Sequence, residues 1–219
     1  MTKKEKSELL DRLKVGLAEL YPDAECALKY EGDPWRLLIM TRLSAQCTDA
    51  KVNTVCKELF AKYPNMEELA AADYDDVADI IRPLGLWRRK SFDIVNASVK
   101  LIVSFGGRVP DSMDSLLTLP GVGRKTANLV LGDIYGKDAV VCDTHFICIM
   151  ARFGMYAPNL KDATKIEYII RELTDVSDGS EFCHRIVTFG REYCTALSPR
   201  CAECPLSDIC PKIGVKGRE

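Results

Sequence analysis

Apolar residues recur at helical spacing along most of the chain. Between residues 4 and 20 they stand at Leu9, Leu10, Leu13, Leu17 and Leu20, which gives a helix one apolar face. Similar spacing and helix-breaking residues predict further helices over 34–47, 50–63, 66–72, 75–82, 88–105, 126–135, 144–153, 161–173 and 180–193, and a short one from residue 111. No stretch alternates for long enough to form a sheet, and 139–142 is only a brief extended run. The pattern predicts an all-α fold of about ten helices.

Charge is unevenly distributed, although the formal net charge is only −2. Residues 66–81 hold six acidic side chains and no lysine or arginine, whereas residues 82–125 hold eight basic side chains and three acidic ones. A molecule with one basic face is compatible with DNA binding. It is equally compatible with an ordinary solvated surface, so the charge pattern alone assigns no partner.

The amino-terminal residues and the cysteines predict an intracellular protein. The chain starts with charged and polar residues that lack the apolar core of a signal peptide, and no apolar run approaches membrane-spanning length. We therefore expect a cytoplasmic protein without membrane contact. Six of the ten cysteines are scattered among apolar or helical neighbours and should be reduced and mostly buried: Cys26, Cys47, Cys56, Cys142, Cys148 and Cys183.

The other four cysteines form a cluster. Cys194, Cys201, Cys204 and Cys210 are separated by six, two and five residues, and four thiolates this close in the chain can enclose one metal centre. Structural zinc sites usually use two close cysteine pairs, whereas Fe–S clusters accept more varied spacings. Only one close pair exists here. The spacing therefore favours an Fe–S cluster over zinc, and a reducing compartment disfavours disulfides.

Two glycines break the helical pattern within residues 119–128, Leu-Pro-Gly-Val-Gly-Arg-Lys-Thr-Ala-Asn. Glycine tolerates the positive φ of a tight turn, so the segment predicts a helix, a hairpin and a second helix. Backbone N–H groups at Gly121, at Gly123 and at the following helix start suit a phosphate oxygen. Lys125 lies in the first turn of that helix, where the helix dipole disfavours a proton on the amine. It is either a nucleophile or a plain phosphate contact.

Four segments occur together in one order: residues 43–49 (Leu-Ser-Ala-Gln-Cys-Thr-Asp), the glycine hairpin, residues 141–145 (Val-Cys-Asp-Thr-His) and the clustered cysteines. The set resembles endonuclease III, the family of bifunctional DNA glycosylases and lyases in the helix-hairpin-helix superfamily. The resemblance implies base-excision repair of damaged double-stranded DNA. Oxidised pyrimidines are removed, and the abasic strand is cleaved by β-elimination. We expect a monomer that is nucleoid-associated when bound to DNA.

The resemblance also implies a domain organisation. Residues 27–137 are expected to form a helical barrel that carries the helix-hairpin-helix. Residues 1–26 together with 138–219 are expected to form a second helical domain, with DNA bound in a cleft between the two. In this second domain a [4Fe-4S] cluster is expected on its four ligands, Cys194, Cys201, Cys204 and Cys210.

The resemblance assigns roles by motif position. Lys125 corresponds to the nucleophile that attacks the sugar C1′ and forms a Schiff base, and Asp143 to the carboxylate that stabilises the developing sugar cation. Asp143 is also a helix N-cap by position, and the two roles are compatible. Gln46 and Leu86 correspond to side chains that fill the gap left by a flipped base; a helix-end glutamine and an exposed loop leucine are the plainer interpretations. DNA contacts are further expected from Gly121, Gly123, Arg124 and Arg200.

Two places depart from the family pattern. Trp87-Arg88 follows Leu86 where Tyr-Asn is common, and Cys148 stands where a basic residue is frequent. Both bear on damage preference and phosphate contacts rather than on the reaction class. Two other functions stay open. An adenine-mismatch glycosylase generally lacks the hairpin lysine, and a non-catalytic Fe–S DNA-binding protein has no need for both Lys125 and Asp143.

Overall fold

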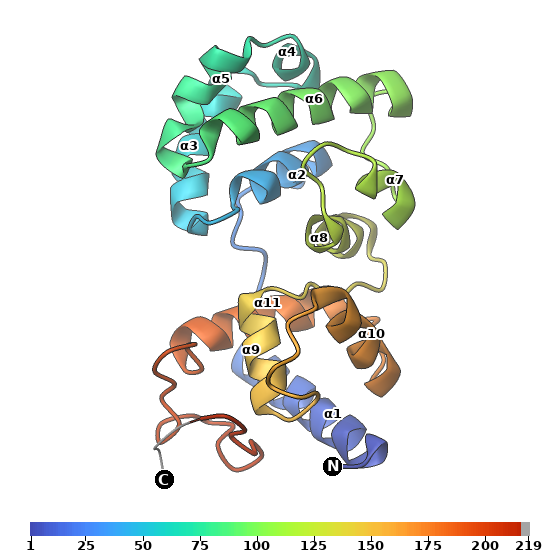
Figure 1. Ribbon diagram of the computed structural model, residues 1–219, viewed down its shortest axis with the longest axis vertical. Coiled ribbons are helices and arrows are strands. Elements are labelled where there is room, and N and C mark those ends of the chain that lie inside the picture. The colour runs from blue at the N-terminus through green and yellow to red at the C-terminus, as the bar shows by residue number, and fades with distance from the viewer. Residues whose placement is uncertain (216–219) are drawn as a thin grey trace. The chain divides into compact units, whose positions relative to one another are not determined.

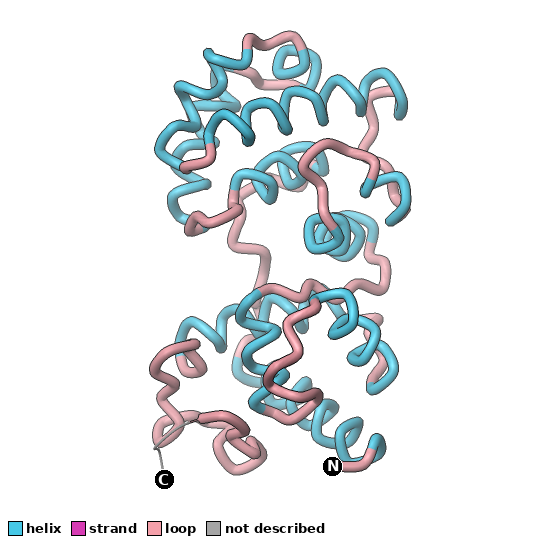
Figure 2. The backbone as a smooth tube through the Cα atoms, viewed as in Figure 1, coloured by secondary structure: helices cyan, strands magenta, loops and turns pink. Residues whose placement is uncertain are grey.

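The computed structural model describes residues 1–215, which form eleven α-helices and one 3₁₀ helix. Helices and loops make up this range and no strand occurs in it (Figure 1, Figure 2), so the all-α prediction is confirmed. The chain divides into two compact units. We call Cys26–Tyr135 the hairpin unit, and Met1–Glu25 with the chain from Gly136 onward the cysteine unit. None of the helices in residues 1–215 is long and apolar enough to cross a membrane.

The cysteine unit contains four helices: α1 (Lys3–Leu20), α9 (Thr144–Arg152), α10 (Ala163–Leu173) and α11 (Gly179–Glu192). α11 packs against α9 and α1, and α1 packs against α10. A capping box between Thr2 and Glu5 starts α1, and its apolar face is fully buried at Leu10, Leu13 and Leu17. The first helix of the chain therefore shares one core with the last ones.

The segment 139–142 is a buried loop, as expected for a run too short for a sheet. Gly179 is required beside it, because a Cβ on Gly179 would lie 2.0 Å from the Ala139 carbonyl oxygen. The Val141 N–H also donates to Cys183 Sγ at 3.2 Å. Both contacts hold the loop against α11, and they fix the point at which Asp143 starts α9.

The hairpin unit contains seven α-helices and the 3₁₀ helix: α2 (Pro34–Leu43), α3 (Asp49–Lys62), α4 (Met66–Ala70), α5 (Tyr74–Ile81), η1 (Arg82–Leu84), α6 (Trp87–Phe105), α7 (Met113–Leu117) and α8 (Arg124–Tyr135). The long helix α6 packs against α2, α4 and α5, and α8 packs against α2 and α7 (Figure 1). Gly106 and Gly107 both have positive φ and end α6 as predicted.

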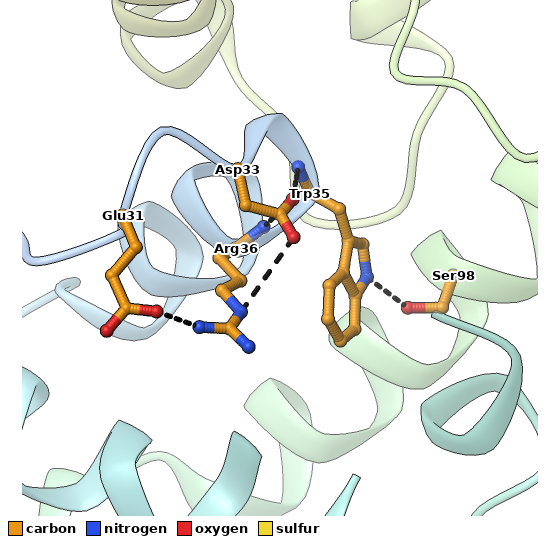
Figure 3. A network of polar contacts seen from close by, with 5 residues as sticks. All are labelled: Glu31, Asp33, Trp35, Arg36 and Ser98. Atoms are coloured by element: carbon orange, nitrogen blue, oxygen red, sulfur yellow. Dashed lines mark hydrogen bonds and ion pairs between the residues drawn. The ribbon is translucent and has the colours of Figure 1, made fainter. Parts of the chain in front are cut away.

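A buried hydrogen bond ties α2 to α6. The Trp35 indole N–H donates to Ser98 Oγ at 3.0 Å (Figure 3), and both residues are buried. Asp33 caps α2 by accepting the N–H groups of Trp35 and Arg36, and the Arg36 guanidinium pairs with Glu31. This network fixes the start of α2 and its position on α6.

The second helix ends earlier than predicted. The apolar run predicts a helix over 34–47, but α2 ends at Leu43 and a turn follows it. Gln46 has a φ of 58°, in the left-handed region that residues other than glycine rarely adopt. The predicted boundary was wrong because a contact from α6 overrides the local helix preference. Lys90 of α6 donates to the Ala45 carbonyl in this turn at 2.8 Å.

Candidate functional site

The glycine hairpin joins α7 to α8. Leu119 and Val122 are buried and anchor the turn, and the Val122 N–H donates to the Leu119 carbonyl at 3.2 Å. Gly121 has a φ of 72°, which side chains disfavour. Gly123 has nothing within 4 Å of the place where a Cβ would stand. Gly121 therefore permits the turn, whereas Gly123 leaves its backbone open to another molecule.

A buried ion pair packs directly against the hairpin. Asp93 of α6 is 1% exposed, and one of its oxygens accepts contacts from Arg42 Nε at 2.8 Å and Nη2 at 2.6 Å. Arg89 Nε lies 3.0 Å from the other oxygen, as an ion pair without hydrogen-bond geometry. A Cβ on Gly121 would lie 2.6 Å from Arg42 Nε and 2.8 Å from Asp93 Cβ. Glycine is therefore needed here for close packing as well as for its φ.

Lys125 lies in the first turn of α8, two residues after Gly123. Its side chain is exposed, and it makes no hydrogen bond or ion pair with any residue in the range 1–215. The first N–H groups of a helix have no acceptor within the helix and attract anions. The adjacent Arg124 is half-buried and adds a second positive charge. An exposed primary amine therefore stands beside a site suited to phosphate.

Gln46 and Leu86 are both exposed, and both adopt the left-handed backbone conformation, with φ of 58° and 49°. Leu86 leaves 54% of its surface in solvent. This conformation costs a residue other than glycine about 1–2 kcal/mol, so the surrounding structure must enforce it. Backbone strain is common at functional sites, and in this structure it also occurs at the exposed Glu31, which pairs with Arg36.

Residues on both sides of Leu86 form a stacked group. The guanidinium of Arg82 lies 4.7 Å from the centre of the Trp87 ring, and that of Arg88 lies 4.4 Å from it. Such cation–π contacts hold a positive charge against an aromatic face. The Trp87-Arg88 departure from the family pattern thus places two stacked arginines beside the exposed leucine.

Asp143 is the N-cap of α9 in the cysteine unit. Its Oδ1 accepts the Phe146 N–H at 2.7 Å, so the predicted capping role is confirmed. The side chain is only half-buried. The cap occupies Oδ1 alone, and the carboxylate charge stands at the positive end of a helix, where it is stabilised.

The four clustered cysteines line one pocket in the cysteine unit, together with residues of α9 and α11. None of the four forms a disulfide. Burial raises the pKa of the Cys194 and Cys204 thiols, and it raises the pKa of Cys210 to about 11. Thiols of this kind lose their protons when they bind a metal cation. Four thiols that line one pocket therefore fit a metal centre, and the described cysteines form no disulfide.

Arg152, the last residue of α9, fastens the loop that contains these cysteines. Its Nη1 donates to the carbonyl oxygens of Cys194 at 3.1 Å and Thr195 at 2.9 Å, and lies 3.0 Å from Cys194 Sγ. Its Nη2 donates to the Ala196 carbonyl at 2.9 Å. A guanidinium against a thiolate favours the anionic form that iron requires. Sequence reasoning missed Arg152, because no local pattern links it to acceptors more than forty residues later.

Arg200 also holds this loop together. Its Nε donates to the Glu192 carbonyl at 3.0 Å, its Nη1 lies 3.3 Å from Glu203 Oε2, and its guanidinium stacks on Tyr193 at 5.2 Å. About half of its side chain remains exposed, 48%. The arginine expected at a phosphate is therefore also a structural part of the loop.

We expect the purified protein to be brown and to contain about four irons per chain, as one [4Fe-4S] cluster requires. Metal analysis of anaerobically prepared protein checks this. Cys204→Ser should lose iron, because it removes one ligand. Cys56→Ala, which changes a buried cysteine outside the pocket, should keep the full iron content. Stoichiometric zinc without iron would contradict the expectation.

Comparison with known proteins gives two family matches. Residues 39–175 match the HhH-GPD superfamily base excision DNA repair protein, and residues 194–210 match the iron-sulfur binding domain of endonuclease III. Endonuclease III of Bacillus subtilis (strain 168) is 40% identical over 195 residues, which cover 89% of this chain and 88% of that protein.

Two solved structures are also similar, each with 36% identity and a TM-score of 0.89. One is a non-covalent endonuclease III–DNA complex, with 97% of this chain and 96% of that chain covered. The other is a trapped endonuclease III–DNA covalent intermediate, the estranged-adenine complex, with 97% of each chain covered.

The match over residues 194–210 agrees with the four-thiol pocket and confirms the predicted [4Fe-4S] cluster over zinc. The match over residues 39–175 contains the turn at Gln46, the glycine hairpin and Asp143. The chain belongs to the endonuclease III family, within the HhH-GPD superfamily of base excision DNA repair proteins.

Proposed function

We propose that Lys125 and Asp143 carry out the reaction of this family in this chain. The protein is a bifunctional DNA glycosylase and abasic-site lyase that removes oxidised pyrimidines from duplex DNA and then cleaves the strand. The observation that carries the proposal is the exposed amine of Lys125, placed in the first turn of α8 two residues after Gly123, the open glycine of the hairpin. The trapped covalent complex of a similar protein supports a covalent mechanism.

The chemistry requires a free amine and a nearby negative charge. The unprotonated Lys125 amine attacks the sugar C1′ as the glycosidic bond breaks, and the base leaves with the bonding electrons and takes up a proton. Asp143 stabilises the positive charge that develops on the sugar and accepts the proton that the attacking amine releases. Opening of the sugar ring gives a Schiff base between Nζ and C1′. Loss of a 2′ proton expels the 3′ phosphate, and water then hydrolyses the Schiff base and frees Lys125.

The DNA contacts divide into backbone and base contacts. The N–H groups of the turn at Gly121 and of the open backbone at Gly123, with the positive charge of Arg124, bind phosphates next to the reacting sugar, and Arg200 contributes a further phosphate contact from the cysteine loop. Gln46 and Leu86 fill the gap left by the extruded base. This filling offsets lost stacking and pairing worth a few kcal/mol.

The proposal also assigns tasks to the two domains, residues 27–137 and residues 1–26 with 138–219. The first supplies the nucleophile and the gap-filling side chains, and the second supplies the carboxylate and the cluster. Both domains must then engage the same nucleotide of the bound DNA. Since one chain supplies every group, the protein acts as a monomer. Its proposed location is the cytoplasm, and the nucleoid when it is bound to DNA.

A strand-nicking assay on a panel of duplexes, each with one lesion, tests the proposed function. We expect cleavage at oxidised pyrimidines, with a product end left by β-elimination rather than by hydrolysis of the phosphodiester. An undamaged duplex is the control and should stay intact. Excision of adenine from a mismatch without strand cleavage would instead indicate a mismatch glycosylase, and binding without any excision would indicate a non-catalytic protein.

A further inference from the structure

Lys90 is a fully buried lysine in the first turn of α6, with 0% of its surface exposed. Its ammonium donates to the carbonyl oxygens of Ala45 and Leu84, both at 2.8 Å, and lies 3.7 Å from Cys47 Sγ. An ammonium group has three hydrogens and no acceptor, so these three partners satisfy all of its donors. Burial lowers the pKa of Lys90, and the neighbouring Cys47 opposes that shift.

The three partners belong to two separate loops of the hairpin unit. Ala45 and Cys47 flank Gln46 in the turn after α2, and Leu84 ends η1 two residues before Leu86. The Cys47 thiol also donates to the Leu84 carbonyl at 2.7 Å. One buried ammonium and one thiol therefore join the two loops to each other.

Each loop carries an exposed side chain in a strained backbone conformation. The φ angles of Gln46 and Leu86 are 58° and 49°, so both residues would gain free energy by relaxing to another conformation. Ordering a free residue costs about 1–2 kcal/mol of backbone entropy. Loops that are already ordered do not pay this cost when DNA binds.

We propose that Lys90 is a positioning residue for base extrusion. It joins the Gln46 loop and the Leu86 loop into one rigid element, so that both side chains already stand in place when the damaged base leaves the duplex. Lys90 is buried and acts through these two side chains. The inference rests on the gap-filling role proposed for Gln46 and Leu86.

The test compares two substrates under single-turnover conditions, which isolate the chemical step from product release. Lys90→Met keeps the length of the side chain and removes its donors. Excision of a lesion paired with a base should slow by about 10- to 100-fold, in line with the loss of hydrogen bonds from a charged group. Cleavage at a preformed abasic site needs no base extrusion and should stay within about twofold of wild type. A variant that only loosened the fold would slow both reactions equally.

Leu86→Gly is the reference variant, since it removes the gap-filling side chain itself. It should show the same split between the substrates, with slower excision of a paired lesion and nearly unchanged cleavage at a preformed abasic site. In a background of Leu86→Gly with Gln46→Ala, Lys90→Met should have little further effect, because its targets are gone. If Leu86→Gly shows no split, the proposed gap-filling role fails. If Leu86→Gly shows the split and Lys90→Met does not, the inference on Lys90 alone is overturned.

Hydrogen exchange on the unmodified holoprotein provides a test that does not depend on a folded variant. Without DNA, the amides of Cys47 and Gly85, which donate to the carbonyls of Ser44 at 3.0 Å and Arg82 at 3.2 Å, should be protected nearly as well as those in the last turn of α2. Lys90→Gln, whose side chain is shorter and uncharged, should speed the exchange of both amides together. Rapid exchange of the Cys47 or the Gly85 amide in the free wild-type protein would overturn the inference, since it would show that this loop is not held in place before DNA binds.

Discussion

Lys125→Gln should abolish both strand cleavage and the covalent adduct that borohydride traps on lesion-containing DNA. Borohydride reduces a Schiff base to a stable amine, so an adduct forms only where an amine has attacked the sugar. Glutamine has nearly the length of lysine but no nucleophilic amine. Because a covalent step then has no substitute group in the site, we expect both signals to fall by roughly 10³-fold or more. Gel separation of protein–DNA adducts and of nicked strands measures the two effects.

Two further variants distinguish the role of the Lys125 amine as a nucleophile from the role of its positive charge. Lys125→Arg keeps a cation beside the phosphates but removes the primary amine, so it should bind lesion duplexes well and still form no adduct. Lys57→Gln changes an exposed lysine on α3 and should trap as efficiently as wild type. An undiminished adduct with Lys125→Gln would show that another amine, such as the N-terminus, attacks the sugar, and the proposed mechanism would then be wrong.

The helices were largely predictable from the sequence because apolar spacing and capping residues agree along most of the chain. Asp162 and Asp143 begin α10 and α9 as side-chain caps, and Gly106 ends α6 in the left-handed conformation that glycine favours. Each of these boundaries depends on residues within one or two helical turns. Such local signals are what a single sequence contains.

The turn at Gln46 could not be predicted in this way. Its conformation depends on Lys90, which lies forty-four residues later in the chain and reaches the carbonyl next to Gln46. In addition, Gln46 and Leu86 are not glycine or asparagine, the residue types that usually adopt a positive φ. The misplaced end of α2 therefore coincides with the segment to which a function in DNA binding is assigned.

The buried charged residues were also not predicted from the sequence. Asp93 and Lys90 lie on α6 in phase with the buried Ile94 and Leu101, so a charged side chain on the apolar face of a helix was the available signal. The partner of such a buried charge, for example Arg42 for Asp93, could not be identified from the sequence because the two residues belong to different helices. Cys194, Cys201, Cys204 and Cys210 were predictable as a group since their chemistry and close spacing are both local.

Asp143→Asn should bind lesion duplexes normally and excise the damaged base about 10²- to 10⁴-fold more slowly, the usual contribution of one positioned acid–base group. The substitution separates the two tasks of this residue. Asparagine is as good an N-cap as aspartate, so the bond from the Phe146 N–H to the cap, 2.7 Å long in the aspartate, can be kept. Only the negative charge disappears, and with it the stabilisation of the sugar cation and the acceptor for the amine proton. Single-turnover excision and equilibrium binding to the same duplex measure the two quantities.

Asp162→Asn is the matched control, because Asp162 caps α10 in the same unit through bonds from the N–H groups of Thr164 and Lys165 at 3.0 and 3.1 Å. It should leave both excision and thermal stability unchanged. Asp143→Ala, by contrast, should lose the cap as well as the charge, and should therefore unfold more easily by about 0.5–2 kcal/mol. If Asp143→Asn excised as fast as wild type while Asp143→Ala were merely less stable, Asp143 would be a helix cap and no more. Another group would then have to stabilise the positive charge that develops on the sugar.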